Sequence, residues 1–289
     1  MAGERGRSLE NLQKPPKRRR AGEASNYRGN GRMPSSSQHR NHLIAALPLE
    51  GCALLRPHLE RVDFESRQIL EKPDRRIRHA YFIERGLVSI NAIGARRLEV
   101  AVVGCEGMIG VAAVLGSDRS PLEALVRVEG DGFRIDVDEL KSAMEKSRAL
   151  RQILLNYAHG FMLQTAHTAL CYGTSKVEER VARWLLLADD RLDNNEIPLT
   201  HQALSEILGV RRASVTVALQ QLEQRRLIFL GRSKIFVSDR NGLERSANGA
   251  YEAQVQKGGA LSLDRSRTIT SNGGHLRRQR VLHKRVSLS

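Results

Sequence analysis

The chain has 289 residues, a formal net charge of +15 and 40% hydrophobic residues, and this length allows two domains. It contains no run of about 18 apolar residues and no signal-peptide pattern, so we expect neither a membrane-spanning nor an exported protein. Its three cysteines, Cys52, Cys105 and Cys171, lack metal-ligand spacing, which argues against a disulfide framework or a metal cluster and favours a reduced, cytoplasmic location.

Most of the positive charge lies at the two ends of the chain. Residues 1–41 hold ten Lys and Arg against three Asp and Glu, and residues 244–289 hold nine against three. Both ends are polar and lack periodic apolar residues, so we predict two disordered basic tails. The run KPPKRRR at Lys14–Arg20 could bind phosphates without sequence preference. A solvated arm without such a role explains it equally well, and translation could instead begin at Met33.

The first part of the remaining chain has a β-type pattern. A short helical lead-in over residues 42–55 is followed by apolar runs that glycines and charged turns interrupt. These runs are Ala80–Ile83, Leu87–Ala92, Leu98–Val103, Ala124–Val128 and Phe133–Ile135. Many short strands at intervals of about 8–12 residues are typical of a sandwich or barrel. We therefore assign residues 42–146 to a β-barrel domain.

A helical period begins near Asp138. Within Ser147–Tyr172, residues spaced alternately by four and three form one line: Leu150, Leu154, Tyr157, Phe161, Gln164, Thr168 and Cys171. This spacing predicts a dimerisation helix over residues 147–172 that pairs with a second copy. The alternative is a helix packed on its own barrel. A further helix is expected near Lys176–Arg191, with Trp184 in the core.

The segment Leu199–Leu230 has the pattern of two short helices joined by a tight turn at Gly209. The hydroxyl of Thr200 can cap the first helix. Two apolar sets would pack the helices together: Leu204, Leu208 and Val210, and Val215, Leu219 and Leu222. The residues then expected to face outward are Arg212, Ala213, Thr216, Val217 and Gln220. An arginine early on an exposed helix can pair with guanine in the major groove, so this pattern indicates a DNA-reading element.

A β-hairpin is expected directly after these helices. The runs Leu227–Leu230 and Lys234–Ser238 are joined by a Gly-Arg-Ser turn. Two helices followed by a hairpin make a winged helix-turn-helix, which we assign to residues 173–243, and Arg232 at the hairpin tip could contact a phosphate. The alternative is a helical hairpin in an unrelated core.

A β-barrel, a long helix and a C-terminal winged helix, in this order, resemble the Crp/Fnr family of bacterial transcription regulators. The most specific match is LTHQALSEILGVRRASVTVALQQLEQRRLI. Further matches are HAYFIERGLVSI (His79–Ile90), VVGCEGMIGVAAVLG (Val102–Gly116), SKVEERVARWLL (Ser175–Leu186) and SDRNGLE (Ser238–Glu244). The resemblance implies an α+β fold: a cyclic-nucleotide-binding-like β-barrel (a double-stranded β-helix), a long dimerisation helix and a C-terminal winged helix-turn-helix.

The resemblance also implies roles for individual residues. Arg212 matches the position at which family members contact guanine. Ala213 and Val217 replace residues that are often charged in the family, which suggests a different operator, with thymine methyl groups as contacts. The positions that touch the phosphate backbone in relatives are here His201, Gln202, Arg211 and Ser214.

Two ligand types of the family are not expected. In cyclic-nucleotide-binding members a Gly-Glu pair holds the ribose and a nearby Arg-Ser pair holds the phosphate, but here Gly110 precedes Val111 and Ser120–Val126 contains no arginine. A buried phosphate without a cation would be costly, so we do not expect cAMP. The N-terminal cysteine group that would hold an iron–sulfur cluster is missing as well. We predict no cofactor and no metal.

The leading functional hypothesis is a homodimeric regulator that binds a pseudo-palindromic operator in double-stranded DNA. RNA polymerase is a candidate further partner, and a small-molecule effector is unknown or lacking. The alternative is a non-specific nucleoid or RNA-binding protein that acts through its basic tails. A cupin-like metal enzyme would need several histidines, yet none lies between His79 and His159. No catalytic motif is present, so we do not expect an enzyme.

Overall fold

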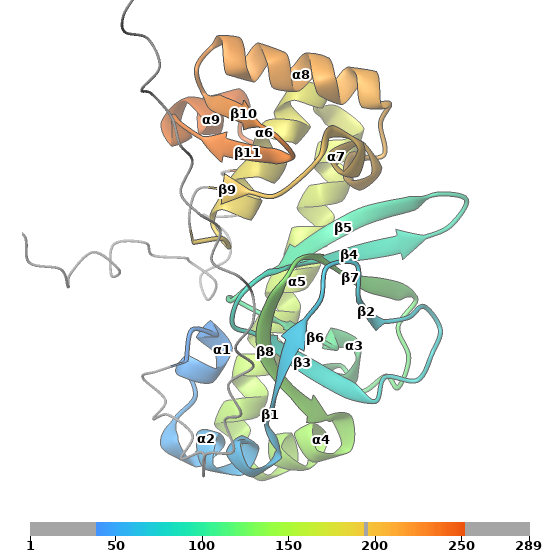
Figure 1. Cartoon of the computed structure of the whole chain (residues 1–289). Coiled ribbons are helices and arrows are strands. Elements are labelled where there is room, and N and C mark those ends of the chain that lie inside the picture. The colour runs from blue at the N-terminus through green and yellow to red at the C-terminus, as the bar shows by residue number, and fades with distance from the viewer. Residues whose placement is uncertain (1–38, 194–195, 252–289) are drawn as a thin grey trace, which may run out of the picture. The chain divides into compact units, whose positions relative to one another are not determined.

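The computed structural model describes residues 39–193 and 196–251 (Figure 1). The elements of the N-terminal part, through the long helix, are α1 (His42–Ala45), α2 (Leu49–Leu55), the 3-10 turn η2 (Arg56–His58), β1 (Glu60–Phe64), β2 (Ile69–Glu71), β3 (His79–Ile83), β4 (Leu87–Ile93), β5 (Arg97–Val103), β6 (Met108–Ile109), α3 (Val111–Val114), β7 (Leu122–Val128), β8 (Gly130–Asp136), α4 (Val137–Lys146) and α5 (Arg148–Thr174). The elements that follow are α6 (Val177–Asp189), β9 (Glu196–Ile197), α7 (His201–Leu208), α8 (Arg212–Gln224), β10 (Ile228–Gly231), β11 (Lys234–Val237) and α9 (Arg240–Ser246).

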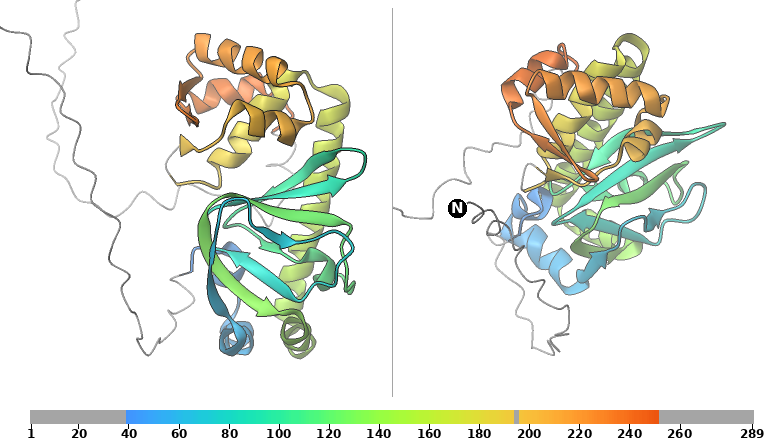
Figure 2. Two further views of the ribbon diagram at one scale, coloured as in Figure 1. Left: turned by 45° about the vertical axis from the view of Figure 1, so that its right-hand side comes forward. Right: turned by 45° about the horizontal axis from the view of Figure 1, so that its top comes forward.

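Two four-stranded antiparallel sheets form the N-terminal domain (Figure 2). Their strand orders are β1-β8-β3-β6 and β2-β7-β4-β5. Apolar residues of both sheets alternate inward and meet in one cluster, because successive side chains of a strand point to opposite faces. The buried members of this cluster are Phe64, Ile83, Val88, Ile90, Ala101, Val103, Ile109, Ala124 and Val126. The predicted α+β class with a β-barrel domain is confirmed, and each predicted apolar run lies in a strand.

The long helix α5 packs along its own barrel. The Tyr157 hydroxyl donates to the carbonyl oxygen of Met108 at 2.8 Å, and the Gln164 side-chain amide donates to the carbonyl of Val102 at 3.1 Å. Tyr157 lies directly over Gly107, where a Cβ atom would come within 2.4 Å of the Tyr157 hydroxyl. A glycine at this position therefore lets the aromatic ring approach the strand backbone.

The predicted dimer seam on α5 is wrong. Six of its seven residues are buried inside the chain, and Phe161 is half-buried against the barrel cluster. The alternative, a helix packed on its own barrel, describes this face correctly. An alternating four-and-three spacing marks any long helix with one buried face, so it does not distinguish a barrel from a second copy as the packing partner.

The second large apolar cluster surrounds α6. Trp184, Leu185 and Leu186 are buried there together with apolar residues of α7, α8 and the hairpin β10–β11. The hairpin pairs in antiparallel register from Ile228 opposite Val237, and β9 adds a third strand at Ile235. The expected helix near residues 176–191, the core position of Trp184 and the predicted hairpin are all confirmed.

The described, folded part of the chain includes residues on the far side of the predicted tail boundaries at residues 41 and 244. The Asn41 side chain is buried and donates to the carbonyls of Ile83 and Gly107. At the other end, α9 is followed by Tyr251, which is buried and donates to Asp190 at 2.7 Å. Residues 39–41 and 244–251 therefore belong to the fold. The rest of both predicted tails, with Lys14–Arg20 and Met33, lies outside the described residues.

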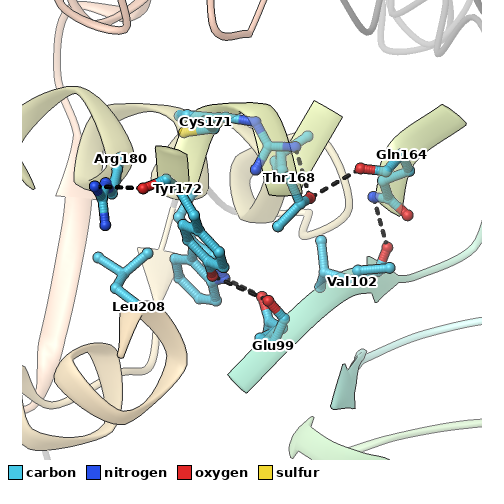
Figure 3. Close-up of a pocket in the computed structure, with 12 residues that line it drawn as sticks. Glu99, Val102, Gln164, Thr168, Cys171, Tyr172, Arg180 and Leu208 are labelled. Atoms are coloured by element: carbon cyan, nitrogen blue, oxygen red, sulfur yellow. Dashed lines mark hydrogen bonds between the residues drawn. The ribbon is translucent and has the colours of Figure 1, made fainter. Parts of the chain in front are cut away.

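A buried polar junction joins α5, β5, α6 and α7 (Figure 3). The Tyr172 hydroxyl lies 3.0 Å from the carbonyl oxygen of Glu99. It also lies 3.1 Å from the carbonyl oxygen of Ile207, and it can donate to either. The indole nitrogen of Trp184 donates to the Glu99 carboxylate at 2.6 Å. Burial raises the pKa of Glu99, and hydrogen bonds from Ser89 and Trp184 partly oppose that shift. This junction is where the barrel, the long helix and the helix-turn-helix meet.

Replacing Tyr172 with Phe removes the hydroxyl that bridges β5 and α7. We expect a loss of about 1–2 kcal/mol in the free energy of unfolding, because a buried hydrogen bond disappears and the carbonyls lose their donor. Urea denaturation followed by circular dichroism measures the change. Tyr81→Phe is the matched control, since Tyr81 is half-buried and its hydroxyl has no hydrogen-bond partner in the described part of the chain. Equal losses in the two variants would contradict the bridging role.

Candidate nucleic-acid interface

Local sequence signals determine the helix-turn-helix. The Thr200 hydroxyl accepts a hydrogen bond from the Ala203 amide at 3.1 Å and caps α7. Gly209 ends the helix with a φ of 64°, a left-handed conformation that glycine adopts without strain. The chain can then turn directly into α8. The predicted cap and turn are both confirmed.

The two predicted apolar sets place one face of α8 inward and the other outward. Leu204, Val215, Leu219 and Leu222 are fully buried, whereas Val210 is half-buried. The predicted site residues on α7 and α8 are all at least partly accessible. The exposed ones are Gln202, Arg211, Arg212, Ala213, Val217 and Gln220, and the half-buried ones are His201, Ser214 and Thr216.

Two of these site residues contact each other across the two helices. The His201 ring nitrogen Nδ1 lies 3.1 Å from the Thr216 hydroxyl, so Thr216 is partly engaged in helix packing and does not point freely outward as predicted. Gln202 donates to Glu206 at 3.0 Å on the exposed side of α7. The exposed face of α8 is thus supported from α7 by a side-chain contact as well as by the apolar core.

The arginines of this surface are available to a ligand. Within residues 39–193 and 196–251, no ion pair engages Arg211, Arg212 or Arg232, although other arginines such as Arg225 and Arg240 are paired. A guanidinium without an internal partner keeps all its donors for phosphate oxygens or base edges. This surface therefore has the chemistry for binding an anion.

The wing carries an arginine and an exposed aromatic ring. Arg232 is exposed at the tip of the β10–β11 hairpin, and Ser233 beside it has a φ of 57°. Lys234 is tied to Glu196 of β9 by an ion pair of 2.5 Å. Phe229 is 59% exposed and lies with its ring 6.0 Å from that of Phe236. Sequence reasoning missed Phe229, because an aromatic residue in a strand is usually a core residue.

Two other kinds of functional feature, metal-binding clusters and membrane-spanning helices, are not found in the described part of the chain. Its side chains contain no group of three or more His, Cys, Asp or Glu that could hold a metal ion. None of its helices combines the length and the apolar character that crossing a membrane requires. His79 is the first residue of β3 and is half-buried.

Comparison with known proteins gives consistent results. Residues 179–246 match the model of the Crp-like helix-turn-helix domain. The global nitrogen regulator of Nostoc sp. strain PCC 7120 is 21% identical over 186 residues, which cover 60% of this chain and 83% of that protein. FixK2 from Bradyrhizobium japonicum superposes with a TM-score of 0.58 at 20% identity, covering 65% of this chain and 96% of FixK2. A putative Crp/Fnr regulator from Eubacterium rectale gives a TM-score of 0.57 at 17% identity, with coverages of 71% and 97%.

At these identities the structural likeness establishes the fold, and the domain match covers both helices and the wing. The surface made by α7, α8 and the β10–β11 hairpin is therefore the helix-turn-helix surface of that domain. The chain has the fold of the Crp/Fnr family of transcription regulators and carries a Crp-like helix-turn-helix domain.

Proposed function

We propose that this protein is a sequence-specific transcription regulator that binds double-stranded DNA as a homodimer on a two-fold symmetric operator. The observation that carries the proposal is the outward face of α8, which begins with the exposed Arg212, a residue without an ion pair in the described part of the chain, on a helix whose other face packs on an apolar core. An α-helix fits the major groove, where each base pair has a distinct pattern of donors and acceptors.

Base readout is assigned to three residues of α8. Arg212 can donate two hydrogen bonds to O6 and N7 of a guanine. Ala213 and Val217 are also exposed, Val217 to 52%, and an apolar side chain in the groove is suited to the methyl group of thymine. The operator half-site is expected to contain one guanine flanked by A·T pairs. Gln220, one turn further along the exposed face, can reach the end of the half-site.

The remaining site residues are assigned to the DNA backbone. Gln202 and Arg211 are exposed near the N-terminal ends of α7 and α8, and Ser214 follows in the first turn of α8. Arg232 at the wing tip is a further phosphate contact. Such contacts set the register of the protein on the duplex and are the same for every base sequence. His201 and Thr216 contribute by fixing α7 against α8.

The homodimer is assigned to the outer face of α5, in place of the buried face predicted from sequence. Exposed residues follow one another there at the alternating four-and-three spacing of a two-helix seam: Leu155, His159, Met162, Ala166, Ala169 and Gly173. Met162 is 57% exposed, and Leu170, which follows Ala169 of this line, is 60% exposed, so large apolar side chains on this side of the helix are available to a partner. A two-fold dimer along this line would bring two recognition helices to successive major grooves, about 34 Å apart.

Replacing Arg212 with Ala should reduce affinity for the selected operator by about 10- to 100-fold, because a bidentate arginine–guanine pair contributes about 1–3 kcal/mol of discrimination. The full-length chain is used to select random duplex DNA at physiological salt, and the variant is then titrated with the enriched site. Arg148→Ala is the matched control, since Arg148 is exposed at the start of α5 and the change in charge is identical.

The selection also separates this proposal from binding through the basic ends. A regulator enriches a two-fold symmetric site, and Arg212→Ala relaxes one base in each half. Binding without enrichment, with steep salt dependence and the same affinity in both variants, would instead support non-specific binding by the Lys- and Arg-rich ends at residues 1–41 and 244–289.

Replacing Ala166 with Glu should dissociate the proposed dimer, raising its dissociation constant at least about tenfold. Two carboxylates would face each other near the two-fold axis without partners, and burying an unpaired charge is costly. Sedimentation velocity over a range of concentrations measures the effect. Ala53→Glu makes the same change at an exposed position of α2 and should leave the dimer intact. A dimer that is unchanged by Ala166→Glu would place the interface elsewhere.

A further inference from the structure

A cavity of about 360 Å³ lies within the barrel domain, separate from the helix-turn-helix. Its walls come from β2, β4, β5, β6 and the start of β7, from α3, and from the middle of α5, where Phe161 and Thr165 face it. This volume falls within the range of about 300–1,000 Å³ that is usual for small-molecule sites. The cavity is therefore large enough for a molecule of two or three fused or linked rings.

The chemistry of the walls is mainly apolar, with one acid. Ile90, Val100 and Leu122 are typical of the lining, whereas Glu71 and Ser120 supply its polar side. None of the described lining residues is a lysine, an arginine or a histidine. Burial raises the pKa of the Glu71 carboxyl, and a hydrogen bond from Ser120 partly opposes this shift.

This lining does not suit an anion. Arg119, the arginine nearest in sequence, is exposed and donates to the carbonyl oxygen of Asp74 at 3.1 Å, so it is held on the surface by the chain. Gly110 is followed by the apolar Val111, both of which line the cavity. An anionic ligand would lose its hydration, find no cation and meet the oxygen atoms of Glu71.

We propose that the cavity binds a small, mainly apolar molecule that carries no negative charge and donates a hydrogen bond to the side chain of Glu71. The apolar walls supply the affinity, at roughly 25 cal/mol for each Å² of apolar surface removed from water. The Glu71 carboxyl supplies orientation and selectivity, because it offers a hydrogen-bond acceptor in a mainly apolar wall, and a ligand with a donor gains a bond there that a ligand without one cannot make.

The position of the cavity also links the ligand to α5. Met162 lines the cavity and is 57% exposed on the outer face of the helix, in the line of residues that the proposed dimer would use. A ligand that contacts Phe161, Met162 and Thr165 can favour one arrangement of this helix over another. This link to DNA binding rests on the proposed function, whereas ligand binding itself does not.

Fluorescence titration of the full-length protein tests the ligand class with three related probes. N-phenyl-1-naphthylamine is apolar and uncharged and has one N–H donor. Its N-methyl derivative lacks the donor, and 1-anilinonaphthalene-8-sulfonate carries the same rings with a negative charge. We expect saturable binding of the amine with one site per chain, at least threefold weaker binding of the methyl derivative and at least tenfold weaker binding of the sulfonate.

Variants then locate the site. Ala112→Phe fills the cavity from α3 and should abolish binding of the amine, whereas Ala53→Phe adds the same ring at an exposed position of α2 and should not. Glu71→Leu should remove the preference for the amine over its methyl derivative. Equal binding of the sulfonate and the amine, or unchanged binding by Ala112→Phe, would overturn the proposal, as would a lack of binding to the unmodified protein.

These titrations contain no DNA, so their outcome is independent of operator binding. The Arg212→Ala variant should bind the amine as the unmodified protein does. A protein that binds the amine and fails to select an operator would leave the cavity proposal standing and refute the regulator proposal. The reverse result would refute the cavity proposal alone.

Discussion

The packing of α5 against its own barrel is the constraint on which the other features of this structure depend. Three side chains of the helix, Tyr157, Gln164 and Tyr172, donate to carbonyl oxygens of Met108, Val102 and Glu99. These donors lie from the middle of the helix to its C-terminal end and fix its rotation about its own axis. That rotation decides which residues are buried, which line the cavity and which remain exposed for a partner.

At its C-terminal end α5 also contacts the helix-turn-helix. Tyr172 approaches the carbonyl of Ile207 in α7, and a Cβ atom on Gly209 would come within 2.6 Å of a methyl group of Leu98 in β5. The turn between α7 and α8 therefore lies against a barrel strand, where only a glycine fits without displacing Leu98. A displacement of β5 or of the C-terminal end of α5 would therefore act by direct contact on α7 and on the turn before α8, the proposed recognition helix.

The barrel encloses a cavity whose mainly apolar lining, with one carboxyl and no cationic side chain among the described lining residues, does not suit an anion. The cavity is roofed by the turn at Gly110 and α3, but its polar groups are a carboxyl and a hydroxyl, Glu71 and Ser120. The charge of a ligand therefore restricts binding in this cavity more strictly than its volume does. An ion loses its hydration on entering, and this cost is offset only if the walls supply a partner of opposite charge. The same reasoning applies in reverse on the helix-turn-helix surface, where the guanidinium groups of Arg211, Arg212 and Arg232 have no ion pair within the described residues and so favour phosphate and guanine.

Local signals in the sequence were sufficient for most elements. Thr200 as a cap, Gly209 as a turn, the periodic leucines of α7 and α8, and the short apolar runs of the barrel each have their cause within a few residues of themselves, so the order of barrel, long helix and helix-turn-helix along the chain could be predicted. The tertiary structure alone decided which side of α5 is buried, because two lines of residues on that helix have dimer-like spacing and only the barrel selects between them. It also decided that residues 39–41 and 244–251 belong to the fold, because their burial depends on contacts with distant segments. Only the folded chain brings Glu71, Ser120 and Met162 together around one cavity, because these residues are far apart in the sequence.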